Sequence, residues 1–233
     1  MARARIALTA AYVLTARPYQ DSSLLVEIFS RDHGRVGLVA RGARGPRSRY
    51  RALLQPLQPL LLSWTEAGGL GTLTGAEADG PAHALGGEPV FYAWYLNELL
   101  LKLLQRHDPH PALYEAYARS LAGLCGARAE AQLRYFELDL LAELGYALWW
   151  PEDLQPGAHY RFDPEHGPQA APAGADSYPA EILQALAERR LEQTAQLTAA
   201  RRLLREALRV QLQGRELQTP RLLRALRARA GRS

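Results

Sequence analysis

The residues best suited to chemistry in this sequence are arginines concentrated between residues 34 and 51. The stretch reads GRVGLVARGARGPRSRYR and holds six arginines and no acidic residue, namely Arg35, Arg41, Arg44, Arg47, Arg49 and Arg51. A guanidinium offers a planar fork of donors that matches a phosphate, and glycine lets a phosphate backbone approach the chain closely. We therefore predict that all six arginines contact a polyanion, against the plainer alternative of a solvated basic surface.

Groups that could carry out catalysis do not converge in the sequence. It lacks a GxSxG nucleophile elbow and a GxxxxGK[ST] phosphate loop. Three acids, Glu137, Asp139 and Glu143, share one predicted helix, where a solvated face is the ordinary explanation. We expect no enzyme activity, no catalytic residue, no cofactor and no metal.

The single cysteine and the apolar runs bear on the compartment. Cys125 excludes an internal disulfide framework and fits a reducing environment, and we expect it to be a small buried residue. No apolar run approaches the length that crosses a bilayer. The expected location is the cytoplasm, without a membrane partner.

The first eighty residues have the pattern of a small β-barrel that would position the arginines. Short runs rich in branched and aromatic residues, separated by glycine turns, predict five strands and a closed or half-closed barrel. These runs are Ala4–Thr15, Ser22–Phe29, Val36–Ala40, Leu57–Trp64 and Leu70–Glu77. Nearby aromatic residues either stack on bases or fill the barrel, and the sequence leaves both open for Tyr12, Tyr19, Tyr50 and Trp64.

From about residue 89 the apolar spacing changes to that of helices. The helical segments predicted are Phe91–Leu104, Pro111–Leu124, Ala129–Leu144, Pro179–Glu192, Thr194–Gln213 and a last helix from Thr219. Residues 151–176 are rich in proline and glycine and predict an irregular insertion. The expected organisation is a β domain over residues 1–80 and an all-α domain over residues 81–233, which together form an α+β chain.

Charge is divided unevenly along the chain. Residues 1–80 carry 10 arginines against 6 acids, residues 81–188 carry 6 basic residues against 15 acids, and residues 189–233 carry 12 arginines against 3 acids. Basic ends around an acidic middle favour a polyanion partner, although the middle can also pair with the ends.

Six segments resemble the RecO family of bacterial recombination-repair proteins. The N-terminal ones are AYVLTARPYQDSSLLVEIFSRDHGRVGLVARGAR, LQPLQPLLLSW and LGTLTGAEA, and the later ones are WYLNELLLKLL, LRYFELDLLAELGY and LQGRELQTPRLLRAL. The resemblance extends over nearly the whole chain outside residues 151–176.

The resemblance implies a non-enzymatic DNA-binding mediator. It implies an N-terminal five-stranded OB-fold barrel followed by a helical domain, and binding of single- and double-stranded DNA. It also implies strand annealing and loading of RecA, together with RecR, onto strands coated by single-stranded DNA-binding protein (SSB), in the cytoplasm at the nucleoid. The family's basic segment corresponds to the arginine stretch, and its contact for the acidic, phenylalanine-ending SSB tail corresponds to Arg134. We add Leu133 and Phe136 as candidate apolar walls for that tail.

The sequence departs from the family pattern at two places. Many members carry a four-cysteine zinc site where residues 151–176 lie, but this segment has no cysteine, as in the zinc-free members. The family's closing lysine-serine-arginine run is replaced by Gln218-Thr219-Pro220, which puts a DNA contact there in doubt.

Two other functions remain open from the sequence. An RNA-binding OB-fold protein fits the charge and the barrel, because nothing in the pattern reads a 2′-hydroxyl. A non-enzymatic protein-interaction scaffold, in which the arginines hold an acidic partner, fits them as well.

Overall fold

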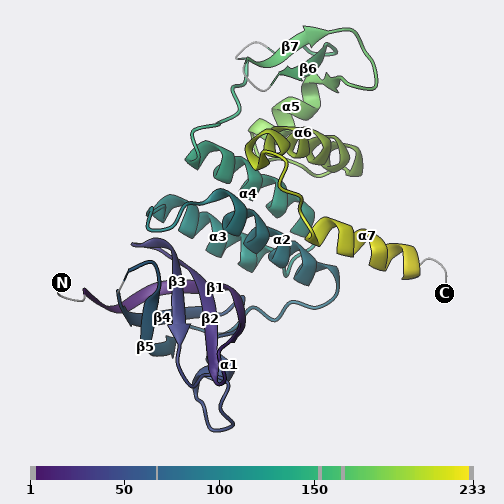
Figure 1. Ribbon diagram of the computed structural model, residues 1–233. Coiled ribbons are helices and arrows are strands. Elements are labelled where there is room, and N and C mark those ends of the chain that lie inside the picture. The colour runs from purple at the N-terminus through teal and green to yellow at the C-terminus, as the bar shows by residue number, and fades with distance from the viewer. Residues whose placement is uncertain (1–3, 67, 152–153, 164–165, 231–233) are drawn as a thin grey trace. The chain divides into compact units, whose positions relative to one another are not determined.

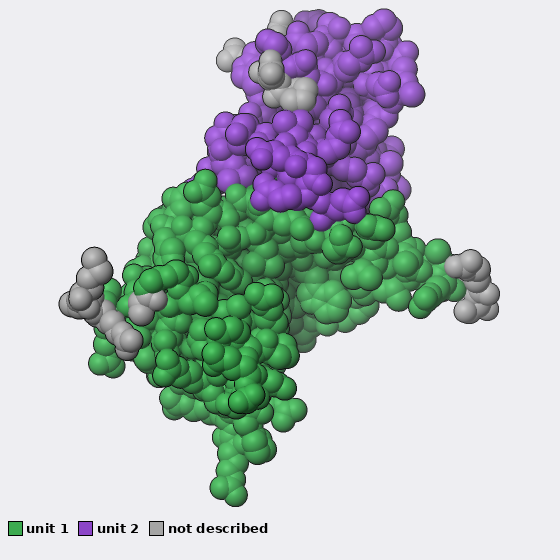
Figure 2. Space-filling view, viewed as in Figure 1, with its two compact units in different colours: residues 1–125, 217–233 green, residues 126–216 purple. Residues whose placement is uncertain are grey.

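The computed structural model describes residues 4–66, 68–151, 154–163 and 166–230. Strands come first and helices follow, which confirms the α+β class (Figure 1). The chain divides into two compact units, residues 1–125 with 217–233 (unit 1) and residues 126–216 (unit 2), coloured separately in Figure 2. Unit 1 thus contains the barrel, two long helices and the C-terminal helix. The boundary between the units differs from the change from strands to helices, which falls near residue 80.

Five strands close into the predicted barrel. They are β1 (Arg5–Tyr19), β2 (Ser23–Ser30), β3 (Gly34–Ala40), β4 (Pro59–Thr65) and β5 (Gly71–Ala78). Their order around the barrel is β1-β2-β3-β5-β4, and a short helix, α1 (Tyr50–Leu53), stands between β3 and β4. This five-stranded arrangement confirms the OB-fold.

The length of β1 allows the barrel to close. Its second half pairs with β2 and its first half pairs with β4, both antiparallel. Its register shifts once against each neighbour, between Val13 and Thr15 and between Ile6 and Thr9. Such irregularities bend a strand and increase its twist, so one continuous strand serves both walls of the barrel.

The barrel interior is filled by alternate side chains of the strands. Residues exposed by 1% or less line it, namely Val13, Val26, Ile28, Val36, Leu38, Leu60, Leu62 and Trp64. Trp64 is therefore a core residue, and Tyr12 is buried as well. Tyr19 and Tyr50 remain half-buried.

Besides α1, the described helices of the barrel's unit are α2 (Glu88–Leu103), α3 (Pro111–Gly123) and α7 (Thr219–Ala230). Asn97 of α2 contacts both β1 and α3. Its Nδ2 donates to the Leu14 carbonyl of β1 at 3.0 Å, and its Oδ1 accepts from the Tyr117 hydroxyl of α3 at 2.5 Å. Burial raises the pKa of Tyr117 well above its ordinary value, so the hydroxyl keeps the proton that it donates. Tyr12 packs edge-on against Tyr117 with ring centroids 5.1 Å apart. Helices α2 and α3 are thus joined to β1 through buried polar groups whose hydrogen bonds are satisfied, next to packed aromatic rings.

Unit 2 contains helices and a small sheet. Its helices are α4 (Ala129–Glu143), α5 (Ala180–Ala187) and α6 (Thr194–Leu212). All the long helices predicted from sequence are confirmed, with ends moved by a few residues. None of the helices in the described part of the chain is long and apolar enough to cross a membrane.

The expectation of an irregular segment over residues 151–176 is wrong for residues 159–163 and 167–171, which form strands. Strands β6 (His159–Asp163), β7 (Gly167–Ala171) and β8 (Tyr178–Pro179) form an antiparallel sheet in the order β7-β6-β8. Residues 152–153 and 164–165 lie outside the described residues. Tyr160, Phe162 and Tyr178 are buried, and this aromatic core outweighs the local proline and glycine content.

We predict that Gly34→Ala lowers the free energy of unfolding by about 2 kcal/mol or more. Gly34 has φ +64°, and an added Cβ would lie 1.9 Å from the carbonyl oxygen of Asp108, in the connection between α2 and α3. Gly42→Ala is the matched control, because Gly42 has φ +66° but no atom within 4 Å of the added Cβ. Urea unfolding measures both variants, and equal losses would contradict the close approach.

Candidate nucleic-acid interface

The connection from β3 to α1, together with the start of α1, presents five of the six predicted arginines at the surface. Residues 41–51 carry exposed side chains at Arg41, Arg44, Arg47, Arg49 and Arg51 and no acidic residue. The connection is anchored by fully buried Ala43, by nearly buried Leu54 just beyond α1, and by the Arg44 amide, which donates to the Ser22 carbonyl at 2.8 Å. We call residues 41–51 the arginine loop.

Two arginines of this loop are oriented by neutral groups. Arg44 Nη1 lies 3.3 and 3.2 Å from the carbonyl oxygens of Gln20 and Asp21, in the turn between β1 and β2. The Arg49 guanidinium lies 5.2 Å from the centre of the Tyr50 ring. The Tyr50 hydroxyl in turn donates to the Thr74 carbonyl of β5 at 3.2 Å. These contacts orient the side chains without placing either guanidinium in an ion pair with a carboxylate.

The other three arginines of the loop are less constrained. Within the described residues, no hydrogen bond or ion pair engages the side chains of Arg41, Arg47 or Arg51. Five guanidinium groups over eleven positions, with no carboxylate among them, create a concentrated positive field. Such a field attracts phosphate oxygens without selecting a base sequence.

Arg35 differs from the other five arginines. Its side chain is 19% exposed, its Nε lies 3.8 Å from a carboxylate oxygen of Glu27, and its Nη1 donates to the Leu101 carbonyl near the end of α2. The Arg35 carbonyl accepts from the His107 amide at 3.0 Å. Arg35 therefore joins β3 to the end of α2, and its position favours a structural role over the predicted phosphate contact.

The residues predicted to receive the SSB tail lie in the interior of unit 2. Leu133, Arg134 and Phe136 of α4 are exposed by 3%, 5% and 0%. Arg134 Nη2 pairs with Oε1 of fully buried Glu137 at 3.0 Å. Leu133 and Phe136 therefore pack in the core, as apolar residues of a helix ordinarily do.

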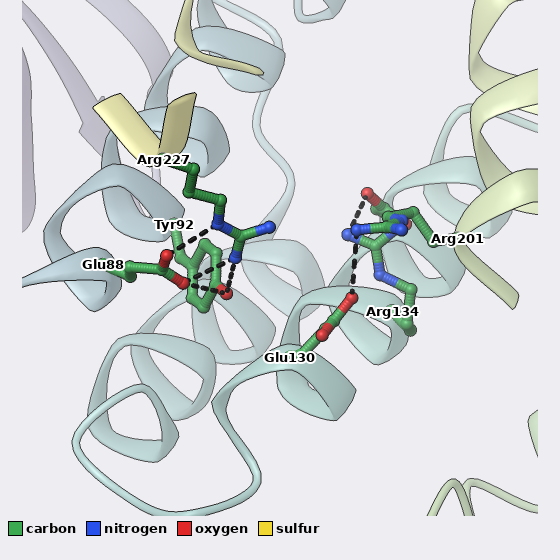
Figure 3. A network of polar contacts seen from close by, with 7 residues as sticks. Glu88, Tyr92, Glu130, Arg134, Arg201 and Arg227 are labelled. Carbon is green, nitrogen blue, oxygen red and sulfur yellow. Dashed lines mark hydrogen bonds and ion pairs between the residues drawn. The ribbon is translucent and has the colours of Figure 1, made fainter. Parts of the chain in front are cut away.

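An ion pair at the surface of unit 2 accompanies this buried pair. Glu130 of α4 lies 3.7 Å from Arg201 of α6, and both side chains are drawn with Arg134 in Figure 3.

The C-terminal helix is tied to α2 at both ends. The Glu98 carboxylate accepts from the amides of Gln218 and Thr219 at 2.8 and 2.9 Å, which satisfies donors at the start of α7. Farther along, Arg227 donates twice to Glu88, at 2.6 Å each, beside Tyr92 (Figure 3). These hydrogen bonds hold the pKa of Glu88 below its ordinary value.

Both histidines of residues 151–176 contact a neighbouring side chain. Among the described residues, no group of three or more histidines, cysteines or acids lies close enough to hold an ion. His159 pairs with Ser177 and His166 with Asp163, each at 3.0 Å. The buried aromatic residues of β6 and β8 supply the core of this sheet.

Two exposed residues of unit 1 were not predicted from the sequence to be at the surface. Cys125 is exposed rather than buried. Trp94, within the predicted helix of residues 91–104, is 43% exposed. Its spacing signalled this, because Trp94, Glu98 and Lys102 recur every four residues and form a polar stripe on α2.

Comparisons with known proteins agree with both halves of the chain. Residues 3–81 match the family model for Recombination protein O N terminal, and residues 87–221 match that for Recombination protein O C terminal. The DNA repair protein RecO of Nitrosococcus oceani is 46% identical over 96% of this chain and 95% of its own. The DNA repair protein RecO of Alkalilimnicola ehrlichii is 46% identical over 95% of this chain and 92% of its own, and that of Azoarcus sp. is 41% identical over 95% and 97%.

We predict that Arg35→Ala lowers the free energy of unfolding by about 1–3 kcal/mol, because it removes charge-assisted hydrogen bonds from a largely buried site. Arg47→Ala, on the exposed loop, should change it by less than about 0.5 kcal/mol. Thermal and urea unfolding measure the difference. If Arg35→Ala left stability unchanged and reduced DNA affinity as much as Arg47→Ala does, Arg35 would be a phosphate contact, as the sequence predicted.

Proposed function

Because this chain belongs to the RecO family, we propose that it is a DNA repair and recombination protein that binds single- and double-stranded DNA through the arginine loop. The observation that carries this proposal is that the arginine loop exposes five arginines and contains no acidic residue. Each guanidinium can replace a counterion on a phosphate, and the released counterions favour binding in a salt-dependent way.

The same electrostatics support annealing of complementary strands. Two phosphate backbones repel each other, and a mobile positive surface between them offsets that repulsion. Exposed side chains such as Arg41 and Arg47 make no hydrogen bond or ion pair within the described residues and can follow either strand. The protein acts without catalytic groups, by holding strands near each other until the bases pair.

The partners proposed for this chain follow from its family. It works with RecR and with SSB, and through them it helps to load RecA onto SSB-coated single strands. The acidic tail of SSB is placed at Arg134 in unit 2, with Leu133 and Phe136 as apolar neighbours. Since all three are buried, the tail must displace part of the covering structure and take over the role of the Glu137 carboxylate.

We predict that DNA binding falls when charge is removed from the arginine loop. An Arg41→Ala/Arg47→Ala variant loses two phosphate contacts, so the slope of log affinity against log salt should decrease by about 1.4 for single strands and about 1.8 for duplexes. Fluorescence anisotropy of labelled oligonucleotides across a salt series measures both slopes.

The matched control is Arg119→Ala/Arg161→Ala, which removes the same charge from two exposed sites outside the loop. Equal effects of the two double variants would mean that only net charge matters, and the loop would not be the DNA site. Competition between DNA and RNA oligonucleotides of the same sequence separates the proposed function from RNA handling. Tight binding of an acidic protein domain in the presence of excess DNA would instead favour the scaffold alternative.

For the SSB tail, we predict that Arg134→Met/Glu137→Leu folds but no longer binds an acidic peptide ending in phenylalanine. Arg134→Ala alone would be uninformative, because it leaves the Glu137 carboxylate buried without its arginine, at a cost of about 3–5 kcal/mol. Replacing both members with apolar residues avoids that cost. Anisotropy of a labelled peptide measures binding, with a peptide lacking the terminal phenylalanine as control. Full affinity in the double variant would remove Arg134 from the site.

A further inference from the structure

A groove in unit 1 continues from the arginine loop toward α2. It has a volume of about 670 Å³ and is bordered by the loop, the end of α1, and one face of α2. Two loop arginines, Arg44 and Arg51, line it on the barrel side, and Trp94 lines it on the helix side. Leu24, Leu54 and Leu101 contribute apolar surface between them.

Trp94 is unusual among the tryptophans of unit 1. Trp64 is fully buried in the barrel, whereas Trp94 is 43% exposed at the groove. Phe91 packs against it with ring centroids 5.2 Å apart and planes at 71°, so the indole is supported from one side. An exposed ring held in this way offers a flat surface at little cost in side-chain entropy.

The acidic residue of the groove is largely engaged by the protein. Glu98 accepts from the amides of Gln218 and Thr219, and Lys102 lies 3.8 Å away. Its side chain is only 14% exposed. The cations Arg44 and Arg51, both exposed, therefore dominate the field at the mouth of the groove.

We propose that this groove binds a segment of single-stranded DNA, with one base stacked on Trp94 and the neighbouring phosphates held by Arg44 and Arg51. The proposal rests on the proposed function and adds a base-binding residue to it. Cations paired with an aromatic platform are the combination that binds unpaired strands without sequence preference. A duplex cannot use the platform, because its bases are already stacked and paired. DNA is favoured over an acidic peptide because Arg44 belongs to both the groove and the loop, so one continuous backbone can cross both.

The test compares Trp94→Ala with wild type by anisotropy on a labelled oligothymidine and on a duplex of equal length. Loss of one stacked base should weaken single-strand binding about tenfold or more and leave duplex binding unchanged. Trp94→Phe should keep most of the affinity. Trp149→Ala is the matched control, since Trp149 is 61% exposed and lies in unit 2. On an oligonucleotide of abasic sites, wild type and Trp94→Ala should bind equally.

The outcomes separate this proposal from the one it rests on. If Arg41→Ala/Arg47→Ala weakens binding but Trp94→Ala does not, the loop binds DNA and the groove does not. If neither variant changes DNA affinity, both proposals fail. Equal losses on single strands and duplexes, or a difference that persists on the abasic strand, would exclude stacking. Loss of binding to an acidic peptide with DNA affinity intact would make the groove a protein site.

Discussion

Like-charge repulsion within the arginine loop is the constraint around which unit 1 is built. Five guanidinium groups on eleven consecutive residues destabilise any fixed arrangement of that loop, since no carboxylate in the loop offsets them. The barrel supplies the opposing free energy through burial of Ala43 and Leu54 on either side of the exposed charges. A flexible chain with this composition would spread its charges apart, whereas the closed barrel keeps them together.

Polar side chains join the barrel to α2 and α3. Asn97 joins the Leu14 carbonyl to the Tyr117 hydroxyl inside an aromatic cluster, and Arg35 joins β3 to the Leu101 carbonyl. The Arg35 connection holds β3, which ends directly before the loop. The Asn97 connection holds β1, which is followed by the turn that Arg44 contacts. The first arginine of the stretch, Arg35, thus stabilises the framework, and the five that follow it remain available to a polyanion.

The sequence predicted the elements that have strong local periodicity and missed the features that depend on distant contacts. The five strands and the long helices follow from spacing and turn residues. The burial of Arg35 depends on a carbonyl 66 residues away, which no local pattern contains. The sheet of residues 159–179 was missed because its strands are two to five residues long and are held by a core that β8 completes from beyond the predicted insertion. For Trp94 the signal was present, since its four-residue spacing with Glu98 and Lys102 marked a polar face.

The loop arginines and Arg134 have opposite electrostatic settings, and the difference bears on how each would meet an anion. In the loop, Arg44 and Arg49 contact only carbonyls and a tyrosine, so a phosphate meets a charge that has no competing carboxylate partner. In α4, Arg134 is already paired with Glu137 in a site from which water is largely excluded. An acidic tail reaching Arg134 must offset both the lost ion pair and the exposure of apolar core. DNA binding should therefore be governed by counterion release and salt, whereas tail binding should be governed by local opening of unit 2.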